Sequence, residues 1–423
     1  MDELLLLDSQ DPLKEFKDKF LIPYVNERPQ IYFSGNSLGL QPRALSDQLQ
    51  NELDRWHQYG AKAYSESDRP WLNLSESLQA PIANLVGAKP DEVVVMNSLG
   101  VNLHLMMASF YQPSKSKFKV IIEEDAFPTD RYILNAHMQW HGYDPKETFI
   151  IFKKNQATHQ YRLDDLAELI EAHKDTIALA LLPGVQYLTG QVFPIAQMSQ
   201  LLKNNNITIG WDMAHAIGNI PLNCHQDHID FAVWCHYKYL NAGPGAVGGC
   251  FIHEQHAQNR EMFRLPGWWG NLPETRFEMK AEFEPYGNAL GWQVSNIPVF
   301  STIPLIASLN IFEQAGGVVA VRQKSTVMTE WLYQHLIERF SEEVAILTPE
   351  PSSERGCQIS FSVRGADNRL ICQKLNKNHI VCDFREPNII RMAPVPLYNQ
   401  FKELGYFIDN LQSIIDQVKS YGR

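Results

Sequence analysis

The chain has 423 residues and a formal net charge of −11, so its length favours two domains and its acidic balance argues against nucleic acid or an acidic membrane as a partner. No run of residues approaches the roughly 18 uninterrupted apolar positions of a membrane-spanning helix, and the short, acidic start is unlike a signal peptide. The six cysteines show no CxxC spacing, which predicts reduced thiols in a cytoplasmic protein.

Apolar residues recur at helical spacing from residue 43 to residue 57, which predicts an amphipathic helix after an extended entry segment. Strands and helices then alternate. The expected strands cover residues 92–96, 118–122, 148–152, 177–182, 207–211, 229–234 and 246–252. The expected helices between them cover residues 101–111, 129–139, 163–173 and 195–203. This alternation predicts an α/β fold with a mainly parallel sheet and helices on both of its faces.

The pattern changes near residue 265. Residues 265–298 are rich in Gly, Pro and Trp and read as loop. After this loop the sequence predicts helices over 303–314, 319–340 and 398–418 and strands over 358–363, 380–384 and 389–392. We therefore expect a large domain over 46–300 and a smaller α+β domain over 301–423. Residues 1–45 are expected to contribute to the small domain and to the entrance of a site.

Two residues that suit one cofactor follow neighbouring predicted strands. Asp212 comes directly after residues 207–211, and Lys238 comes shortly after residues 229–234. Ligands of open α/β sheets bind beyond the carboxyl ends of the strands, so both side chains are expected at one crevice. A lysine forms a Schiff base with the aldehyde of pyridoxal 5'-phosphate (PLP), and a carboxylate pairs with its ring nitrogen. Either residue alone is more often a surface acid or a lysine packed on aromatic rings, but their joint placement favours the cofactor.

Four further places have both a functional and an ordinary interpretation. Residues 97–102 lead from a strand into a helix, so their backbone N–H groups suit a phosphate, with a simple helix cap as the alternative. Phe127 opens the next helix and either faces the cofactor ring or packs in the core. Tyr237 either reaches the phosphate and transfers a proton or only packs beside the lysine. Arg391 offers a planar fork for a substrate carboxylate, although a lone arginine is usually solvated.

Nine blocks of residues carry a resemblance, in order and over nearly the whole chain. They are YFSGNSLGLQP (32–42), RPW (69–71), VNLH (101–104), AFP (126–128), GVQY with TGQ (184–191), YKYLNAG (237–243), GWWG (267–270), SN (295–296) and RMAPVPLY (391–398). Together they resemble the kynureninase family. This resemblance implies a fold-type-I PLP-dependent enzyme that works as a homodimer.

The resemblance also implies a reaction. Members of the family hydrolyse the Cβ–Cγ bond of L-kynurenine, or of its 3-hydroxy derivative, to anthranilate or 3-hydroxyanthranilate and L-alanine. The step belongs to tryptophan catabolism and NAD biosynthesis. The expected partner is therefore a small-molecule substrate, with no metal, nucleic acid or membrane.

Roles for single residues follow from the same resemblance, position by position. Lys238 forms the Schiff base, Asp212 pairs with the ring nitrogen and Tyr237 lies near the phosphate, and these three form the expected catalytic set. The other expected cofactor contacts are Leu99 and Gly100 through their backbone, Phe127 by stacking on the ring, Asp130 and His215 beside it, and Trp268 and Asn296, which reach it across the dimer interface. The expected substrate-binding residues are Arg391 for the α-carboxylate, Tyr64 and Asn36.

Three positions depart from the family pattern. Tyr64 stands where the family usually has a histidine that contacts the aromatic end of the substrate. Gly100 replaces a hydroxyl-bearing residue at the phosphate turn, and Pro183 replaces a serine or threonine near the cofactor. Each lost hydrogen bond to a charged group is worth roughly 1.5–3 kcal/mol, so these changes predict weaker phosphate binding and an altered substrate preference.

Two other functions fit parts of the same pattern. A related PLP-dependent lyase such as a cysteine desulfurase shares the frame of Asp212, His215 and Lys238. That chemistry needs a thiol on a mobile loop, and Cys357, just ahead of a predicted strand, is a poor candidate for it. A non-catalytic paralogue is the second alternative, because three positions depart from the family pattern.

Overall fold

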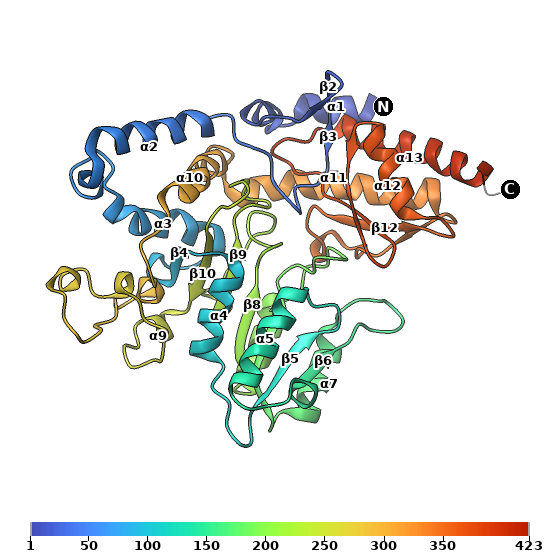
Figure 1. Cartoon of the computed structure of the whole chain (residues 1–423). Coiled ribbons are helices and arrows are strands. Elements are labelled where there is room, and N and C mark those ends of the chain that lie inside the picture. The colour runs from blue at the N-terminus through green and yellow to red at the C-terminus, as the bar shows by residue number, and fades with distance from the viewer. Residues whose placement is uncertain (1, 422–423) are drawn as a thin grey trace.

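The computed structural model describes residues 2–421 and builds its larger sheet from seven strands (Figure 1). Their order is β4-β10-β9-β8-β7-β5-β6, and all except β10 run parallel to one another. The expected mainly parallel α/β sheet is therefore confirmed. The strands are β4 (Val93–Met96), β5 (Lys119–Glu123), β6 (Phe149–Phe152), β7 (Ile177–Pro183), β8 (Thr208–Asp212), β9 (Phe231–Cys235) and β10 (Gly248–Ile252).

Both faces of this sheet are buried. On β4, Val93 and Val95 join one hydrophobic core, whereas Val94 and Met96 join the core on the opposite face. This division follows from the two-residue period of a strand, and it explains why the strand has apolar residues at every position. The helices that cover the sheet are α3 (Leu74–Val86), α7 (Leu163–His173), α8 (Ile195–Asn204) and α10 (Val299–Gln314) on the first face and α4 (Leu99–Phe110) and α5 (Pro128–Trp140) on the second.

A four-stranded antiparallel sheet and its helices form a third core. The strand order is β11-β12-β15-β14, and β3 pairs in parallel with β13 beside this sheet. Leu4 and Phe33, from the N-terminal segment, are buried in the same core. The elements are α1 (Asp2–Gln10), β3 (Ile31–Tyr32), α11 (Gly317–Phe340), β11 (Val344–Ile346), β12 (Ile359–Val363), α12 (Asn368–Lys377), β13 (Ile380–Val381), β14 (Asp383–Arg385), β15 (Ile389–Met392) and α13 (Phe401–Tyr421).

Several predicted elements need correction. The single strand expected over 380–384 is wrong, because β13 and β14 belong to different sheets and the buried Cys382 separates them. The entry segment is not simply extended, since α1 forms there and packs on α13, next to it in Figure 1. The sequence reading also omitted α3, which carries Pro81 in its interior, and α12, which Asp367 caps through two backbone N–H groups. Tertiary contacts and caps, rather than periodicity, select these elements.

The remaining segments lie around the large sheet. The predicted amphipathic helix is α2 (Leu45–Tyr59), which packs on α10 and extends away from the sheet at the upper left of Figure 1. Residues 265–298 contain only short 3₁₀ turns, as expected for a loop-rich stretch. Within residues 2–421, no single helix is long and apolar enough to cross a membrane, and only α10 with α11, bent by 73° at their junction, passes that test as a pair.

Candidate active site

A cavity opens where the parallel strands of the large sheet end. Eight of the predicted site residues line it, and the strand ends of β5, β7 and β8 form part of its wall. These eight are Leu99, Gly100, Phe127, Asp130, Asp212, His215, Tyr237 and Lys238. The rest of the wall consists of Ser98, Glu123, Thr129, Pro183, Val185, Tyr187 and Ala214.

Lys238 and His215 are joined by a hydrogen bond inside the cavity. The distance from Lys238 Nζ to His215 Nε2 is 2.9 Å. Burial, followed by the positive charges of Lys238, Arg391 and Arg385, holds the pKa of His215 well below its usual range. A neutral His215 therefore accepts the proton of Lys238 at Nε2 and carries its own proton at Nδ1. That Nδ1 atom is buried and has no hydrogen-bond partner in the described part of the chain.

Asp212 and Asp130 form a coupled carboxyl pair on the cavity wall. Burial, together with the negative charge of Asp212, raises the pKa of Asp130 well above its usual range. Asp130 is therefore protonated at neutral pH and donates a hydrogen bond to Asp212. Burial also raises the pKa of Asp212, but Lys238 and the N–H group of Ala214, 2.7 Å from Oδ1, act against that shift. The pair thus concentrates one negative charge on Asp212.

Glu123 adds a third carboxyl group to this region. It ends β5, is buried and lines the same cavity. Burial and the nearby charges of Asp212 and Asp125 raise the pKa of Glu123 to about 8. With Asp130 and Glu123 holding protons, Asp212 is the one anion of these three carboxyl groups, and it favours the binding of a group that brings a positive charge.

The N-terminus of α4 faces the cavity and suits an anion. Ser98 is the residue before this helix, and its side chain forms no capping hydrogen bond. Leu99 and Gly100 are the first two residues of α4 and line the cavity beside it. The first backbone N–H groups of a helix have no partner within the helix and carry the positive end of its dipole. This turn can therefore hold a phosphate.

Two aromatic rings form another part of the wall. The Phe127 ring meets the Tyr187 ring edge to face, with 5.2 Å between the ring centroids. Phe127 is exposed, in agreement with a ring that faces open space rather than the core. Its position just before α5 leaves one face of the ring free to stack on a flat ligand.

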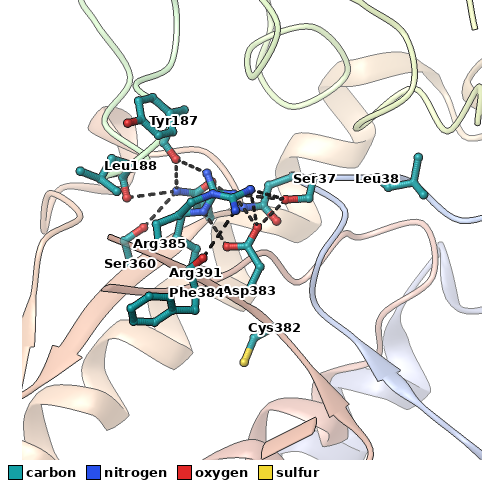
Figure 2. A network of polar contacts seen from close by, with 12 residues as sticks. Ser37, Leu38, Tyr187, Leu188, Ser360, Cys382, Asp383, Phe384, Arg385 and Arg391 are labelled. Atoms are coloured by element: carbon teal, nitrogen blue, oxygen red, sulfur yellow. Dashed lines mark hydrogen bonds and ion pairs between the residues drawn. The ribbon is translucent and has the colours of Figure 1, made fainter. Parts of the chain in front are cut away.

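Arg391 lies behind this wall, in a network that Figure 2 shows. Its side chain is 2% exposed. Nε donates to Asp383 Oδ1 at 2.8 Å, and Nη2 donates to Asp383 Oδ2 at 2.5 Å. Nη1 donates to the carbonyl oxygen of Tyr187 at 2.6 Å, and Nη2 also donates to Ser37 Oγ at 3.1 Å. Asp383 faces Arg391 across the antiparallel pair β14–β15, so the register of these strands creates the ion pair.

Five of the predicted site residues are not among those that line the cavity within residues 2–421. Arg391 is the first of them. Tyr64 is 38% exposed and packs edge to face on Trp71, while Trp268 is 50% exposed and lines a separate surface hollow. Asn36 is fully buried and donates to Gln358 Oε1 at 3.0 Å. Asn296 is half-buried, and its Oδ1 has no partner in the described chain.

Sequence reasoning missed several residues that shape the site. Glu123 and Tyr187 line the cavity, and Asp383 with Ser37 fixes Arg391. Glu123 directly follows a predicted strand, as Asp212 does, so the same rule about strand ends identifies it. Asp383 could have been found from its place opposite Arg391 in the β14–β15 hairpin. The single strand predicted over 380–384 did not indicate this hairpin.

The residues present fit PLP. Asp130 Oδ1 and His215 Nδ1 are buried polar atoms without a partner in the described chain, which is expected where a ligand completes the site. An anionic carboxylate, a lysine amine and a helix N-terminus suit the ring nitrogen, the aldehyde and the phosphate in turn. A Cβ at Gly100 would meet no atom closer than 3.7 Å, so this position also has space for a small side chain.

Known proteins resemble this chain in both fold and sequence. The cysteine desulfurase of Thermococcus onnurineus NA1 superposes with a TM-score of 0.77 at 17% identity, covering 97% of this chain and 99% of that one. A C-DES mutant with glycine covalently linked to its PLP cofactor superposes with a TM-score of 0.75 at 19% identity, covering 90% and 96% of the two chains. These likenesses show the fold, which is that of the fold-type-I PLP-dependent enzymes, and the cavity described above has the residues that suit PLP.

Sequence similarity is more specific. A family profile described as the kynureninase C-terminal domain matches residues 321–411. Kynureninase from Xanthomonas euvesicatoria pv. vesicatoria (strain 85-10) is 44% identical over 409 residues, or 96% of each chain. Kynureninase from Myxococcus xanthus (strain DK1622) is also 44% identical, over 96% of this chain and 95% of its own. The chain belongs to the kynureninase family, whose members are PLP-dependent hydrolases.

The N-terminus of α4 yields a test of cofactor affinity. Replacing Gly100 with Ser restores a hydroxyl donor, and the new Cβ has room because Thr129 and Ile133 lie 3.7 and 3.8 Å away. One added hydrogen bond to a charged phosphate is expected to lower the Kd for PLP about tenfold. Spectroscopic titration of the apoprotein with PLP measures this change. Gly100→Ala is the matched control, and equal Kd values for the two variants contradict the assignment.

Glu123 yields a test of stability against pH. The pKa of Glu123 rises from 4.5 to about 8 in the fold, so the folded state holds this proton more tightly and its contribution to stability is lost as pH rises through that interval. We expect the Tm of apo Glu123→Gln to fall less between pH 4.5 and 8 than the Tm of the native apoprotein. Thermal unfolding followed by circular dichroism measures both. Glu124→Gln, at an exposed neighbour, is the control, and parallel curves for native protein and Glu123→Gln contradict the prediction.

Proposed function

We propose that this enzyme hydrolyses the Cβ–Cγ bond of L-kynurenine or 3-hydroxykynurenine to give anthranilate or 3-hydroxyanthranilate and L-alanine. The observation that carries the proposal is 44% identity to curated kynureninases over 96% of the chain. The cavity supports it, because a lysine, an anionic carboxylate and an open helix N-terminus meet there. We propose tryptophan catabolism and NAD biosynthesis as the metabolic setting, on the same grounds.

We assign the transfer of the substrate's α-proton to Lys238. When bound, PLP supplies a positively charged ring that accepts the electron pair left on the substrate carbon. Lys238 Nζ donates a hydrogen bond to neutral His215 Nε2, which orients the lysine within the cavity. With substrate in the cavity, Lys238 Nζ would be the base that takes the proton from the α-carbon.

Asp212 and Asp130 keep the electron-accepting ring protonated in this proposal. Asp130 retains its own proton because burial and Asp212 raise its pKa. The hydrogen bond from Asp130 holds Asp212 in its anionic form, which is the form that pairs with a protonated ring nitrogen. Phe127, an exposed ring in the cavity wall, would stack on one face of the cofactor ring.

Tyr237 is proposed as a proton donor near the phosphate end. It lines the cavity and shares a hydrogen bond with the Cys235 thiol. Burial raises the pKa of Tyr237, so its hydroxyl stays protonated in the neutral pH range. The remaining roles, phosphate contacts from Leu99 and Gly100 and further cofactor contacts from His215, Trp268 and Asn296, are proposed from the family resemblance. Asn36 and Tyr64 are proposed substrate contacts on the same basis.

We also propose that the enzyme is a cytoplasmic homodimer. Large apolar side chains are exposed on α2, at Leu53 and Trp56, and in the loop-rich stretch, at Trp268, Phe277 and Met279. Apolar surface of this kind supports contact with a second copy.

We further propose that the chain divides into a large domain over 46–300 and a small domain over 301–423, with residues 1–45 joined to the small domain. The burial of Leu4 and Phe33 beside α13 supports this place for the N-terminal residues.

A cysteine desulfurase activity is not favoured. That chemistry needs a thiol close to the substrate, but all six cysteines lie within residues 2–421, all are buried and none lines the cavity. Cys357 in particular is buried beside Tyr239. Likeness to desulfurase structures below 25% identity therefore reflects the fold.

The proposed reaction has a direct test. Native holoprotein with L-kynurenine is expected to release anthranilate, which fluorescence detects, and L-alanine in equal amounts. Lys238→Ala is expected to lower kcat on the order of 10³-fold, because it removes the general base, and to abolish the absorbance band of lysine-bound PLP. Lys153→Ala, at an exposed position, is the control. Native protein that releases no anthranilate contradicts the function.

Tyr64 yields a test of substrate preference. Tyr64→His restores the residue type that the family usually has, which is smaller and titrates near neutral pH. We expect the ratio of kcat/KM for 3-hydroxykynurenine and kynurenine to change about tenfold, because a different polar group then faces the aromatic end of the substrate. Steady-state kinetics with both substrates measure the ratio. Tyr132→His, at a tyrosine that is 67% exposed, is the control, and an unchanged ratio in Tyr64→His places Tyr64 outside the aromatic pocket.

A further inference from the structure

The hydrogen bonds of Arg391 leave it with little capacity for a ligand. A guanidinium group has five N–H donors. Asp383 takes the donor on Nε and one on Nη2, Ser37 takes the second on Nη2, and the carbonyl oxygen of Tyr187 takes one on Nη1. A single N–H of Nη1 remains. Arg391 alone therefore offers a carboxylate one hydrogen bond instead of a two-pronged fork.

The charge around Arg391 leads to the same conclusion. Asp383 pairs with both arms of its guanidinium, so the pair is neutral as a unit. A substrate carboxylate beside Arg391 would lie close to the negative charge of Asp383. Like charges a few ångströms apart repel, so a second cation is needed to make this place attractive for an anion.

Arg385 is that second cation. Its Nη2 atom lies 3.2 Å from Asp383 Oδ2 and 3.3 Å from Ser37 Oγ, so the two arginines share both partners. Figure 2 shows the two guanidinium groups together between Ser37, Asp383 and Tyr187. A third contact joins Arg385 Nη1 to the carbonyl oxygen of Phe384 at 3.5 Å, so all three Arg385 contacts are long. The Arg385 side chain is 43% exposed. Its donors are thus more available than those of Arg391.

Arg385 also lies close to the catalytic cavity. Its charge and that of Arg391 both reach His215, where they add to burial and to Lys238 in holding the pKa of the imidazole down. The two charges also reach Tyr187, which lines the cavity, where they oppose the burial that raises its pKa. Two arginines and one aspartate give a net charge of +1 at this place, which one carboxylate neutralises.

We propose that Arg385 and Arg391 together bind the α-carboxylate of the substrate, with Asp383 as the tether that holds both arginines. The carboxylate accepts the free N–H of Arg391 Nη1 and the exposed N–H groups of Arg385. This inference rests on the proposed function for the identity of the substrate, but the binding of any α-amino acid to the holoenzyme tests it. Arg385 is thus a determinant of specificity for a free carboxylate.

The test compares two ligands that differ only at this group. Holoenzyme is titrated with L-alanine and with L-alaninamide, and the change in cofactor absorbance gives each Kd. In Arg385→Gln, the Kd for L-alanine is expected to rise about 10- to 100-fold, since a charged hydrogen bond is lost, while the Kd for L-alaninamide stays unchanged. Arg385→Lys keeps the charge and is expected to recover part of the affinity. Arg339→Gln is the control, an arginine of similar exposure that pairs with Asp409.

Each outcome decides the proposal. Loss confined to L-alanine supports it, whereas equal losses for both ligands indicate a merely structural role and overturn it. An unchanged Kd for L-alanine, or native enzyme that binds both ligands equally, also overturns it. If Arg385→Gln does not fold, Arg385→Lys carries the test, with weaker binding of L-alanine alone as the expected result and unchanged binding as the contrary one. Anthranilate release by native enzyme is measured separately, so failure of the proposed function is distinguished from failure of this inference.

Discussion

The site depends on the parallel alignment of β5, β7, β8 and β9. Parallel strands place their carboxyl ends at one edge of the sheet, so residues far apart in the sequence meet there. Glu123 ends β5, Asp212 ends β8, and Lys238 follows β9 by three residues. Antiparallel neighbours would send these residues to opposite edges, and no common cavity would form.

This convergence brings carboxyl groups together in a place with little water. An isolated buried charge is costly, so each group must be protonated or paired. Asp130 and Glu123 avoid a buried charge by remaining protonated, as their raised pKa values indicate. Asp212 is stabilised as an anion by the nearby charge of Lys238, by the hydrogen bond from Asp130 and by the N–H group of Ala214. The result is a single anion at the place where a protonated ring nitrogen is needed, with protonated acids behind it.

Sequence reasoning identified the parts of the site that depend on local order. Lys238, Asp212 and the turn at Leu99 follow predicted strands, so the rule about strand ends locates them from the sequence. Arg391 was predicted to bind a carboxylate, but its partner Asp383 was missed, because their contact depends on the register of β14 and β15. Likewise β13 pairs with β3, nearly 350 residues earlier in the chain, and such a pairing leaves no trace in the periodicity of either segment. The proposed roles of Trp268 and Asn296 rest on family resemblance, since neither lines the cavity in the described chain.

The same register explains how the proposed carboxylate-binding arginines are held. Asp383 and Arg391 form a cross-strand ion pair in the small sheet. Arg391 also donates to the carbonyl oxygen of Tyr187, in the loop after β7 of the large sheet, and to Ser37 of the N-terminal segment. Three separate parts of the chain thus fix one guanidinium. Because Tyr187 also contacts the Phe127 ring, the arginines and the aromatic wall of the cavity are mechanically joined. Groups held before binding lose little entropy when the substrate arrives, so this network favours a pre-formed site over one that the ligand must assemble.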